Sequence, residues 1–459
     1  MKLYNTLTRT VEPLKPIKKD QVSIYVCGAT VQGSPHIGHM RTAVVFDVLR
    51  RWLTVKNYQV TLIRNVTDID DKILHTAGHE NRPWWAVAAH YEREFTNAYS
   101  NLGVLPPTAE PRATGHIPQM IELISELMAN GHAYAIDGDV YFDVDTFSQY
   151  GALSNQKVKE LLTSADSKER NKKAPYDFAL WKSTMPGDTP SWQTPWGSGR
   201  PGWHIECSAM ARFYLGKAFD IHGGGLDLAF PHHENEIAQS QAAGDDFAQV
   251  WMHSAWVTAA GEKMSKSLGN SMQVANLLNQ VSGLELRYYL ASAHYRSMLE
   301  FSESALSEAA TGFSRISSFV KRAAVLVGNT ESGEMSAEFI TAMDDDLNLP
   351  IALSVLHETV RVGNTAITNK SKSELAQLLG QVLAMTRALG ICPIDAPWDG
   401  SSTGSETQVI DSLVQDLLAQ REVARNNKDF KTADLIRDQL KNAGLLIEDT
   451  EQGARWSIE

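Results

Sequence analysis

The sequence predicts an α/β protein: a doubly wound, Rossmann-like core with an insertion, followed by an α-helical bundle and a small C-terminal module. Residues 22–27 form an apolar, β-branched run that leads through a polar loop into periodic apolar residues from Met40 to Leu53. This is the pattern of strand, loop and helix. A second strand candidate, residues 58–66, ends at an acidic, hydroxyl-bearing cluster, and past Leu306 the apolar spacing becomes helical.

The texture of the chain changes between residues 110 and 200, which we interpret as an insertion. Asp137-Gly138 lies between two β-rich runs and predicts a hairpin, and the polar residues 161–173 indicate a surface loop. The α/β pattern returns near Trp203 and includes a helix expected to start at Pro231. The core sheet is therefore expected to be discontinuous in sequence.

Composition excludes several classes of protein. With 459 residues, 43% of them hydrophobic, the chain can bury a large core. Its net charge of −12 argues against nonspecific nucleic-acid binding. Residues 1–20 lack the apolar centre of a secretory signal, and no run of ~18 apolar residues occurs, so we expect a cytoplasmic protein without a membrane anchor. The three cysteines, Cys27, Cys207 and Cys392, are expected to be free thiols or metal ligands.

Residues 36–39 (HIGH) lie where the loop after the first strand enters a helix. Backbone N–H groups and the helix dipole at such a terminus suit phosphate binding. His36 and His39 can donate hydrogen bonds to phosphate oxygens, and Gly38 lets adenine approach the backbone. Alone, such a four-residue string also recurs by chance.

Residues 263–267 (KMSKS) lie between Gly261 and Gly269, which predicts a mobile loop carrying Lys263 and Lys266. Charge builds up on the departing pyrophosphate when a carboxylate attacks the α-phosphate of ATP, and lysines brought in by loop closure would stabilise it. A solvated surface loop is the alternative. The two motifs together indicate an adenylylation site.

Two cysteines and a histidine-rich helix form a candidate metal site. His232 and Glu236 are four residues apart, so their side chains are expected on one helix face, and His233 with Glu236 is the runner-up pair. Cys27 and Cys207 would complete a donor set that suits tetrahedral Zn2+. Buried structural cysteines and a helical ion pair are the alternatives.

Over essentially its whole length the chain resembles the cysteinyl-tRNA synthetase family of class I aminoacyl-tRNA synthetases. The blocks that carry the resemblance are YVCGATVQGSPHIGHMRT, RNVTDIDDKI, RPGWHIECSAM, FDIHGGGLDLAFPHHENEIAQS, GEKMSKSLGN and DFKTADLIRDQLKNAGLLIEDTEQG. The segments GATVQGSPHIGH and AHYRSMLEFSE resemble the actinobacterial branch. The resemblance implies activation of L-cysteine with ATP and Mg2+, transfer to the 3′ end of tRNA(Cys), and a bacterial monomer.

The resemblance also implies roles for individual residues. It makes one Zn2+ bound by Cys27, Cys207, His232 and Glu236 the selector of the substrate thiolate. The implied amino-acid site comprises Cys27, Gly28, Thr67, Trp203, His222 and Asp227. The implied ATP and adenylate site comprises Thr30, His36, Gly38, His39, Thr42, Asn65, Val66, Gly225, Val257 and Lys266. His36, His39, Lys263 and Lys266 are the expected catalytic residues.

Texture and resemblance together divide the chain into seven segments. These are residues 1–112 and 199–250 (the two catalytic halves), 113–198 (connective insertion), 251–305 (lysine-loop segment), 306–392 (helical bundle), 393–408 (linker) and 409–459 (anticodon-binding domain). Basic residues from Arg421 to Lys441 are expected in one helical stretch. The tRNA-contact candidates are Arg425, Lys428, Arg437 and Trp456.

Two other functions share parts of this pattern. A mycothiol-pathway cysteine ligase has the same cysteine-activating core, but its resemblance ends at the helical region, whereas this chain continues through a linker and a further module. A synthetase-like protein that binds tRNA without charging it would not need an intact donor quartet and both ATP motifs. We therefore expect a tRNA-charging enzyme, with Cys392 outside the active site.

Overall fold

The computed structural model describes residues 1–156, 171–185, 190–259, 262–263, 272–328, 330–398, 405–427, 429–450 and 453–458. Contacts divide the chain into two compact units, Met1–Pro393 and Ile394–Glu459. Among the described residues, no helix has the length and apolarity needed to cross a bilayer.

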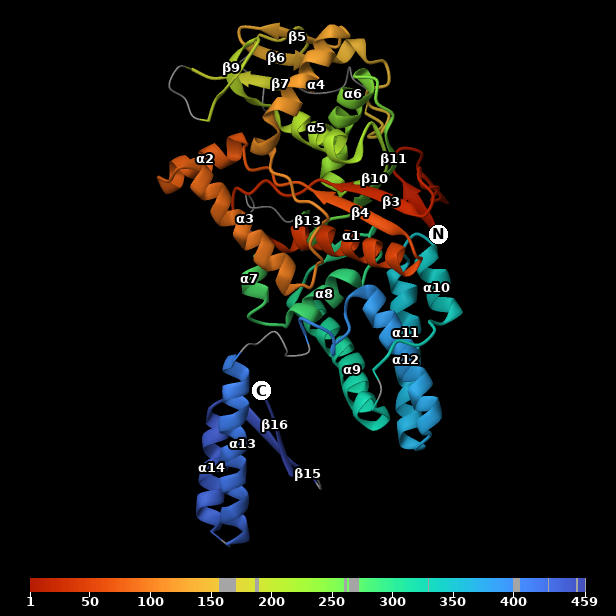
Figure 1. Ribbon diagram of the computed structural model, residues 1–459, viewed down its shortest axis with the longest axis vertical. Helices are drawn as coiled ribbons and strands as arrows, with labels where there is room; N and C mark the ends of the chain where they lie inside the picture. Colours follow the sequence, from red (N-terminus) through yellow and green to blue (C-terminus); the bar gives the residue numbers. More distant parts are fainter. Residues whose placement is uncertain are drawn as a thin grey trace. The chain divides into compact units, whose positions relative to one another are not determined.

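A parallel sheet of four strands, in the order β11-β10-β3-β4, forms the centre of the first unit (Figure 1). Its strands are β3 (Gln21–Val26), β4 (Gln59–Arg64), β10 (Ala218–Gly225) and β11 (Phe247–Ser254). β3 and β4 precede the insertion, whereas β10 and β11 follow it, and β10 pairs directly with β3. The expected discontinuous sheet is confirmed, and the carboxyl ends of all four strands meet at one edge.

Helices connect and flank these strands. They are α1 (Ile37–Val55), α2 (Asp71–Glu80), α3 (Trp84–Asn101), α5 (Trp203–Leu215) and α6 (Glu234–Ala242). α1 begins three residues before the first expected position, Met40, because His36 is its N-cap, and the His36 backbone N–H donates to Nδ1 of His39 (3.2 Å). The histidine motif therefore occupies a helix N-terminus, as predicted.

The insertion combines helices with an antiparallel sheet in the order β5-β6-β7-β9-β8. Its elements are η1 (Ala113–His116), α4 (Ile117–Ala129), β5 (Ala133–Ile136), β6 (Asp139–Phe142), η2 (Val144–Thr146), β7 (Phe178–Ser183), β8 (Trp192–Thr194) and β9 (Gly197–Pro201). The predicted hairpin is confirmed, with Ile136 paired to Asp139. Asp137 and Gly138 have φ values of 51° and 86°, the left-handed conformation that a two-residue hairpin turn requires.

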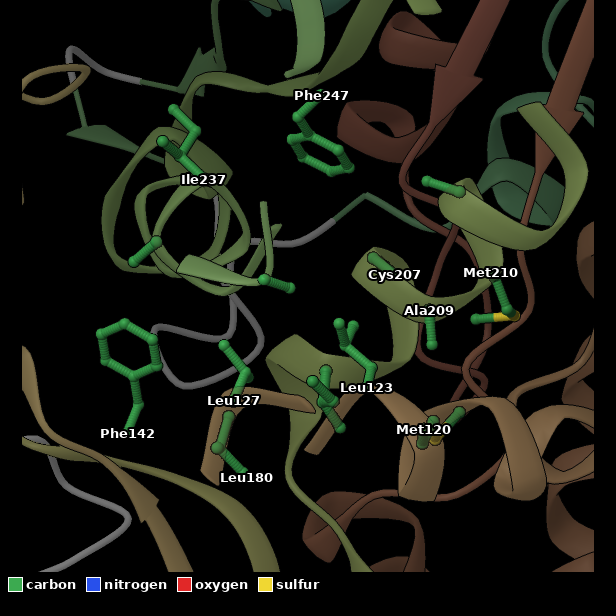
Figure 2. Close-up of a cluster of buried hydrophobic side chains, with 14 of the residues drawn as sticks. Met120, Leu123, Leu127, Phe142, Leu180, Cys207, Ala209, Met210, Ile237 and Phe247 are labelled. Carbon is green, nitrogen blue, oxygen red and sulfur yellow. The ribbon is translucent and has the colours of Figure 1, made fainter. Parts of the chain in front are cut away.

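One apolar core is shared by the insertion and the helices α5 and α6 (Figure 2). Met120 and Leu123 of α4 pack in this cluster with Met210 of α5 and Ile237 of α6. Cys207 belongs to the same cluster. Packing across the insertion therefore helps to set the position of the helix that carries Cys207.

The remainder of the first unit is largely helical. Its elements are β1 (Lys2–Asn5), β2 (Thr10–Pro13), β12 (Val257–Ala259), β13 (Glu262–Lys263), β14 (Leu299–Glu300), α7 (Val274–Leu277), α8 (Gly283–Ala291), α9 (Glu303–Val327), α10 (Ala337–Asp344), α11 (Leu349–Thr368) and α12 (Lys372–Leu389). Arg287 of α8 is fully buried and donates to the carbonyls of Leu102 and Leu389 and to the carboxylate of Asp47. This guanidinium ties the helical region to α1.

The second unit consists of α13 (Ser405–Asn426), α14 (Phe430–Asn442) and the hairpin β15 (Leu445–Thr450) and β16 (Gly453–Ile458). The expectation of one helical stretch through the basic residues is wrong. The chain leaves the helix after Asn426, and the Asp429 side chain caps α14 by accepting from the Thr432 N–H. α13 starts at Ser405, within the expected linker segment 393–408.

Candidate active site

The expected metal donors converge at the carboxyl edge of the parallel sheet. Cys27 directly follows β3, and Cys207 lies on α5. His232 lies in η6 (Ala229–His233), and Glu236 in the first turn of α6. Segments 180 residues apart in sequence thus meet, because β3 and β10 are neighbours in the sheet and α5 packs across both.

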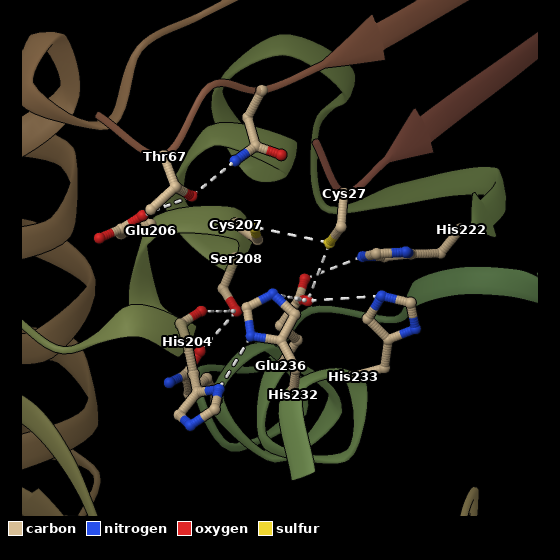
Figure 3. Close-up of polar contacts among 12 residues, drawn as sticks. Cys27, Thr67, His204, Glu206, Cys207, Ser208, His222, His232, His233 and Glu236 are labelled. Atoms are coloured by element: carbon tan, nitrogen blue, oxygen red, sulfur yellow. Dashed lines mark hydrogen bonds and ion pairs between the residues drawn. The ribbon is translucent and has the colours of Figure 1, made fainter. Parts of the chain in front are cut away.

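The four donor atoms lie close enough to bind one ion (Figure 3). The Cys27 and Cys207 sulfurs are 3.5 Å apart, and Cys27 Sγ is 3.4 Å from Glu236 Oε1. His232 Nε2 lies 3.1 Å from the same carboxylate oxygen. All four donor atoms lie within 4.8 Å of one another, and all four residues are buried.

The local helix geometry differs from the expectation. The regular helix α6 begins at Glu234 rather than Pro231, and the residues before it form the separate turn η6, which is non-helical at Phe230. His232 and Glu236 are still in contact, because the chain continues from η6 into α6 without a break.

A second donor set overlaps the first and consists of Cys27, His222, His233 and Glu236. Its His222 Nε2 lies 2.8 Å from Glu236 Oε2, but His233 Nε2 is 4.0 Å from Glu236 Oε1. His233 Nε2 has no hydrogen-bond partner among the described residues. The runner-up pairing of His233 with Glu236 is therefore the looser of the two.

Two buried histidines that sequence reasoning missed lie within hydrogen-bond distance of the candidate donors His232 and His233. His204 Nδ1 lies 2.9 Å from His232 Nδ1, and His253 Nε2 lies 2.8 Å from His233 Nδ1. The position of His204 one helical turn before Cys207 was the available sequence signal for its presence near the donors, although not for its contact with His232. A hydrogen bond to one ring nitrogen orients the other nitrogen toward a ligand.

Burial shifts the titration of the donors in opposite directions. It raises the pKa of both Cys27 and Cys207 and lowers the pKa of His232 well below its usual value, since charged forms are costly away from water. A divalent cation would favour both the thiolates and the neutral imidazole, which are the forms that bind metals.

The expected amino-acid site lies beside this cluster. The Trp203 ring stacks on His232, with centroids 4.2 Å apart. Gly28 is joined to Thr67 by two hydrogen bonds through Asn65: the Gly28 N–H donates to Asn65 Oδ1 (2.8 Å), and Asn65 Nδ2 donates to Thr67 Oγ1 (3.2 Å). Asp227 lies in η5 (Leu226–Leu228), directly after β10, and is exposed.

A buried carboxylate that sequence reasoning missed adjoins this site. Thr67 Oγ1 donates to Glu206 Oε2 at 3.0 Å, and Glu206 is only 1% exposed. Burial raises the pKa of Glu206 well above its usual value. Its position directly before Cys207, on a helix that is otherwise largely apolar at its centre, was the available signal.

The first ATP motif surrounds the start of α1. The rings of His36 and His39 stack with centroids 3.6 Å apart, and both side chains are half-buried. Thr42 Oγ1 lies 2.7 Å from Ser254 Oγ at the end of β11. Other expected adenylate residues lie at or just beyond the carboxyl ends of the sheet strands, namely Thr30, Asn65, Val66, Gly225 and Val257.

Only the beginning of the second motif lies within the described residues. Lys263 ends β13, whereas residues 264–271, including Lys266, are outside them. The chain that follows lies against the first motif: the Ile37 N–H donates to the Met272 carbonyl (3.0 Å), and the Val274 N–H donates to the Pro35 carbonyl (3.1 Å). The flanks of the two motifs are therefore adjacent.

Comparison with known proteins decides the family. A model of the class I tRNA synthetase (C) catalytic domain matches residues 13–311. A cysteine–tRNA ligase of Streptomyces avermitilis is 53% identical over 462 aligned positions that cover 100% of this chain and 99% of the relative. The chain belongs to the cysteine–tRNA ligase family. A Streptomyces griseus member is 51% identical with the same coverage, in agreement with the actinobacterial resemblance.

The rest of this cysteine–tRNA ligase family member also matches known models. A DALR domain covers residues 338–392, and a cysteinyl-tRNA ligase anticodon-binding domain covers residues 408–456. Among solved structures, Mycobacterium tuberculosis methionyl-tRNA synthetase in complex with methionyl-adenylate aligns with a TM-score of 0.58 and 14% identity, over 81% of this chain and 90% of that one. That likeness confirms the class I synthetase fold.

Proposed function

We propose that this enzyme activates L-cysteine with ATP, transfers it to the 3′ end of tRNA(Cys), and selects the substrate thiolate with one bound Zn2+. The observation that carries the proposal is the buried quartet of Cys27, Cys207, His232 and Glu236 beside the first ATP motif. Family membership supports the overall reaction. The donor set supports the choice of metal.

The donor distances fit zinc. A tetrahedral zinc ion with sulfur ligands at about 2.3 Å and nitrogen or oxygen ligands at about 2.0–2.2 Å requires donor separations of about 3.3–3.8 Å. The 3.5 and 3.4 Å separations lie within this range, and the 3.1 Å separation between His232 Nε2 and Glu236 Oε1 lies slightly below it. The 4.0 Å separation between His233 and Glu236 is the poorer match, so we favour His232.

The chemistry of the donors explains the proposed selectivity. Serine and cysteine differ by one atom, and a pocket that relies on shape discriminates by only about 1–3 kcal/mol. Bound Zn2+ would favour a thiolate over a neutral alcohol, without acting as the Lewis acid of the reaction. Two thiolates and a carboxylate exceed its charge, and we propose His222, which lies 2.8 Å from Glu236 Oε2, as the group that offsets the excess.

The proposed amino-acid site uses residues around this cluster. Gly28 and Thr67 would contact the substrate backbone, and Trp203 and His222 would line its side-chain pocket. Asp227 is the proposed partner of the ammonium group, because an exposed carboxylate at the strand edge can pair with a cation.

The proposed ATP site combines the helix terminus with the lysine motif. His36 and His39 would donate hydrogen bonds to the phosphates at the N-terminus of α1, with ATP entering as its Mg2+ complex. Lys263 and Lys266 would stabilise the pyrophosphate as charge develops on it. The hydrogen bonds from Ile37 to Met272 and from Val274 to Pro35 support this pairing, because they hold residues 272–274, which follow the lysine motif in sequence, against the histidine motif.

The second unit is the proposed anticodon reader. Its helices pack through Val414 and Leu418 of α13 and Ile436 and Leu440 of α14, which leaves Arg425 and Arg437 exposed to solvent. Exposed arginines can bind the phosphate backbone, and Trp456 of β16 is the proposed base-stacking residue. Lys428, also proposed, lies outside the described residues. We further propose that the protein is cytoplasmic and monomeric. Light scattering of the purified protein would test the oligomeric state.

The deciding experiment supplies ATP and L-cysteine with two alternative acceptors. We expect cysteine-dependent ATP–pyrophosphate exchange and formation of cysteinyl-tRNA(Cys). Exchange without charged tRNA would contradict the proposal, and transfer to an amino-sugar inositol would establish the cysteine ligase instead. Exchange supported by serine nearly as well as by cysteine would rule out selection by zinc.

A further inference from the structure

We propose that Glu206 is a positioning residue for the amino-acid site, because its carboxyl group terminates a buried hydrogen-bond chain that runs from Gly28 through Asn65 and Thr67. Figure 3 shows the Thr67 hydroxyl beside this carboxyl group. The inference rests on the proposed function, in which Gly28 and Thr67 contact the substrate cysteine.

The direction of every hydrogen bond in the chain follows from its first member. The Gly28 backbone N–H can only donate, so Asn65 must present Oδ1 to it, at 2.8 Å. Asn65 Nδ2 then donates to Thr67 Oγ1 at 3.2 Å. The Thr67 proton must go to another acceptor, and Glu206 Oε2 lies 3.0 Å away. A carboxyl oxygen can accept this proton whether or not Glu206 is ionised.

Burial makes the last hydrogen bond difficult to replace. Asn65, Thr67 and Glu206 are each 1% exposed. If Glu206 could not accept, the Thr67 hydroxyl would be buried without a hydrogen-bond acceptor. Leaving a buried donor unsatisfied costs free energy. Rotation of Thr67 to find another acceptor would break its bond to Asn65, so the disturbance would reach Gly28.

The hydrogen-bond chain connects the segment after β3 to the segment after β4, and the distance between these segments sets the width of the proposed substrate site. The Thr67 N–H donates to the Ala29 carbonyl (3.3 Å), and the Val31 N–H donates to the Thr67 carbonyl (3.2 Å). Cys27 directly precedes Gly28, so the same contacts adjoin the metal donor from β3. Glu206 therefore sets the position of groups that would hold the amino acid, while its neighbour Cys207 would hold the metal.

The test compares Glu206→Met, which keeps the length of the side chain but removes the acceptor, with Ser208→Ala as the matched control. Ser208 directly follows Cys207 in α5, as Glu206 directly precedes it. Ser208 is also buried, but it donates to Gln239 and takes no part in the hydrogen-bond chain. Measured by ATP–pyrophosphate exchange, Glu206→Met should raise the KM for cysteine about tenfold or more, with the zinc content unchanged. Ser208→Ala should leave the KM for cysteine unchanged.

Changes at Thr67 keep the test decisive if Glu206→Met does not fold. Thr67→Val should reproduce the rise in KM, Thr67→Ser should restore it, and Glu206→Gln, which retains an acceptor, should lie near the wild type. Loss of zinc from Glu206→Met, or a wild-type KM for Thr67→Val, would overturn the inference. Failure of the proposed function is distinguishable, because the wild-type enzyme would then show no cysteine-dependent exchange.

Discussion

His204 Nδ1 lies 2.9 Å from Nδ1 of His232, and both rings are buried. The contact occupies one nitrogen of His232 and directs Nε2 toward Glu236, 3.1 Å away. Burial lowers the pKa of His204 to about 3, so this histidine stays neutral throughout the physiological range. The second donor set has the equivalent arrangement in His253 and His233.

These two contacts provide a test of which histidine binds the metal. Replacing a histidine that orients a zinc ligand typically weakens zinc binding by about 10- to 100-fold. We expect His204→Phe to weaken zinc binding by this amount in competition with a chelator, and His253→Phe to leave it nearly unchanged. The reverse ranking would assign the metal to the set that contains His233.

The two buried cysteines of the site should behave differently from the third. Cys207→Ser should lower the zinc content measured by atomic absorption and raise the KM for cysteine by roughly a hundredfold, because an alcohol is a poor zinc ligand. The KM for ATP should change little. Cys392→Ser is the control, since Cys392 follows α12 and is equally buried. One zinc per chain in Cys207→Ser would remove Cys207 from the donor set.

Gly28 should tolerate no side chain. A Cβ at this position would lie 1.7 Å from the Asn65 carbonyl oxygen, so Gly28→Ala must separate the segments that follow β3 and β4. We expect cysteine-dependent exchange to fall about a hundredfold. Gly78→Ala in α2 is the matched control, because nothing lies within 4 Å of its added Cβ, and it should stabilise the protein by about 0.5–1 kcal/mol. Full activity in Gly28→Ala would contradict the geometry.

The buried pair of Asp47 and Arg287 should make stability depend on pH. Burial raises the pKa of Asp47, but the positive charges of Arg287 and Arg51 outweigh this effect and hold the pKa below its usual value. A lowered folded-state pKa means that the stabilisation is present above about pH 4 and is lost as the pH falls through the folded-state value. Asp47→Asn should therefore lower the free energy of unfolding by about 3–5 kcal/mol at pH 7.

Urea unfolding followed by tryptophan fluorescence at several pH values would measure this effect. The difference between wild type and Asp47→Asn should shrink as the pH falls below about 4, because Asp47 is protonated first in the unfolded chain and only at lower pH in the folded protein. Glu358→Gln removes the exposed pair with Arg361 and should leave the unfolding free energy unchanged within error. A difference that does not vary with pH would show that packing, not charge, dominates at Asp47.

Local patterns determined much of this fold. The apolar, β-branched run at residues 22–27, the Asp137-Gly138 turn and the apolar periodicity after Leu306 each depend on neighbours in sequence, and the corresponding strand, hairpin and helices are present. The spacing of His232 and Glu236 likewise anticipated their contact. The helix break between Asn426 and Phe430 was missed because Asp429 acts as a cap only through its side-chain conformation.

Residue type and order were enough to nominate Cys27, Cys207, His232 and Glu236 as metal donors and residues 36–39 as an ATP motif. Only the tertiary structure showed that Thr67 meets Glu206 and that His204 meets His232, because each pair joins side chains from different elements. Their interaction depends on how α5 packs against the sheet and on the exclusion of water. No spacing in one sequence encodes either of these.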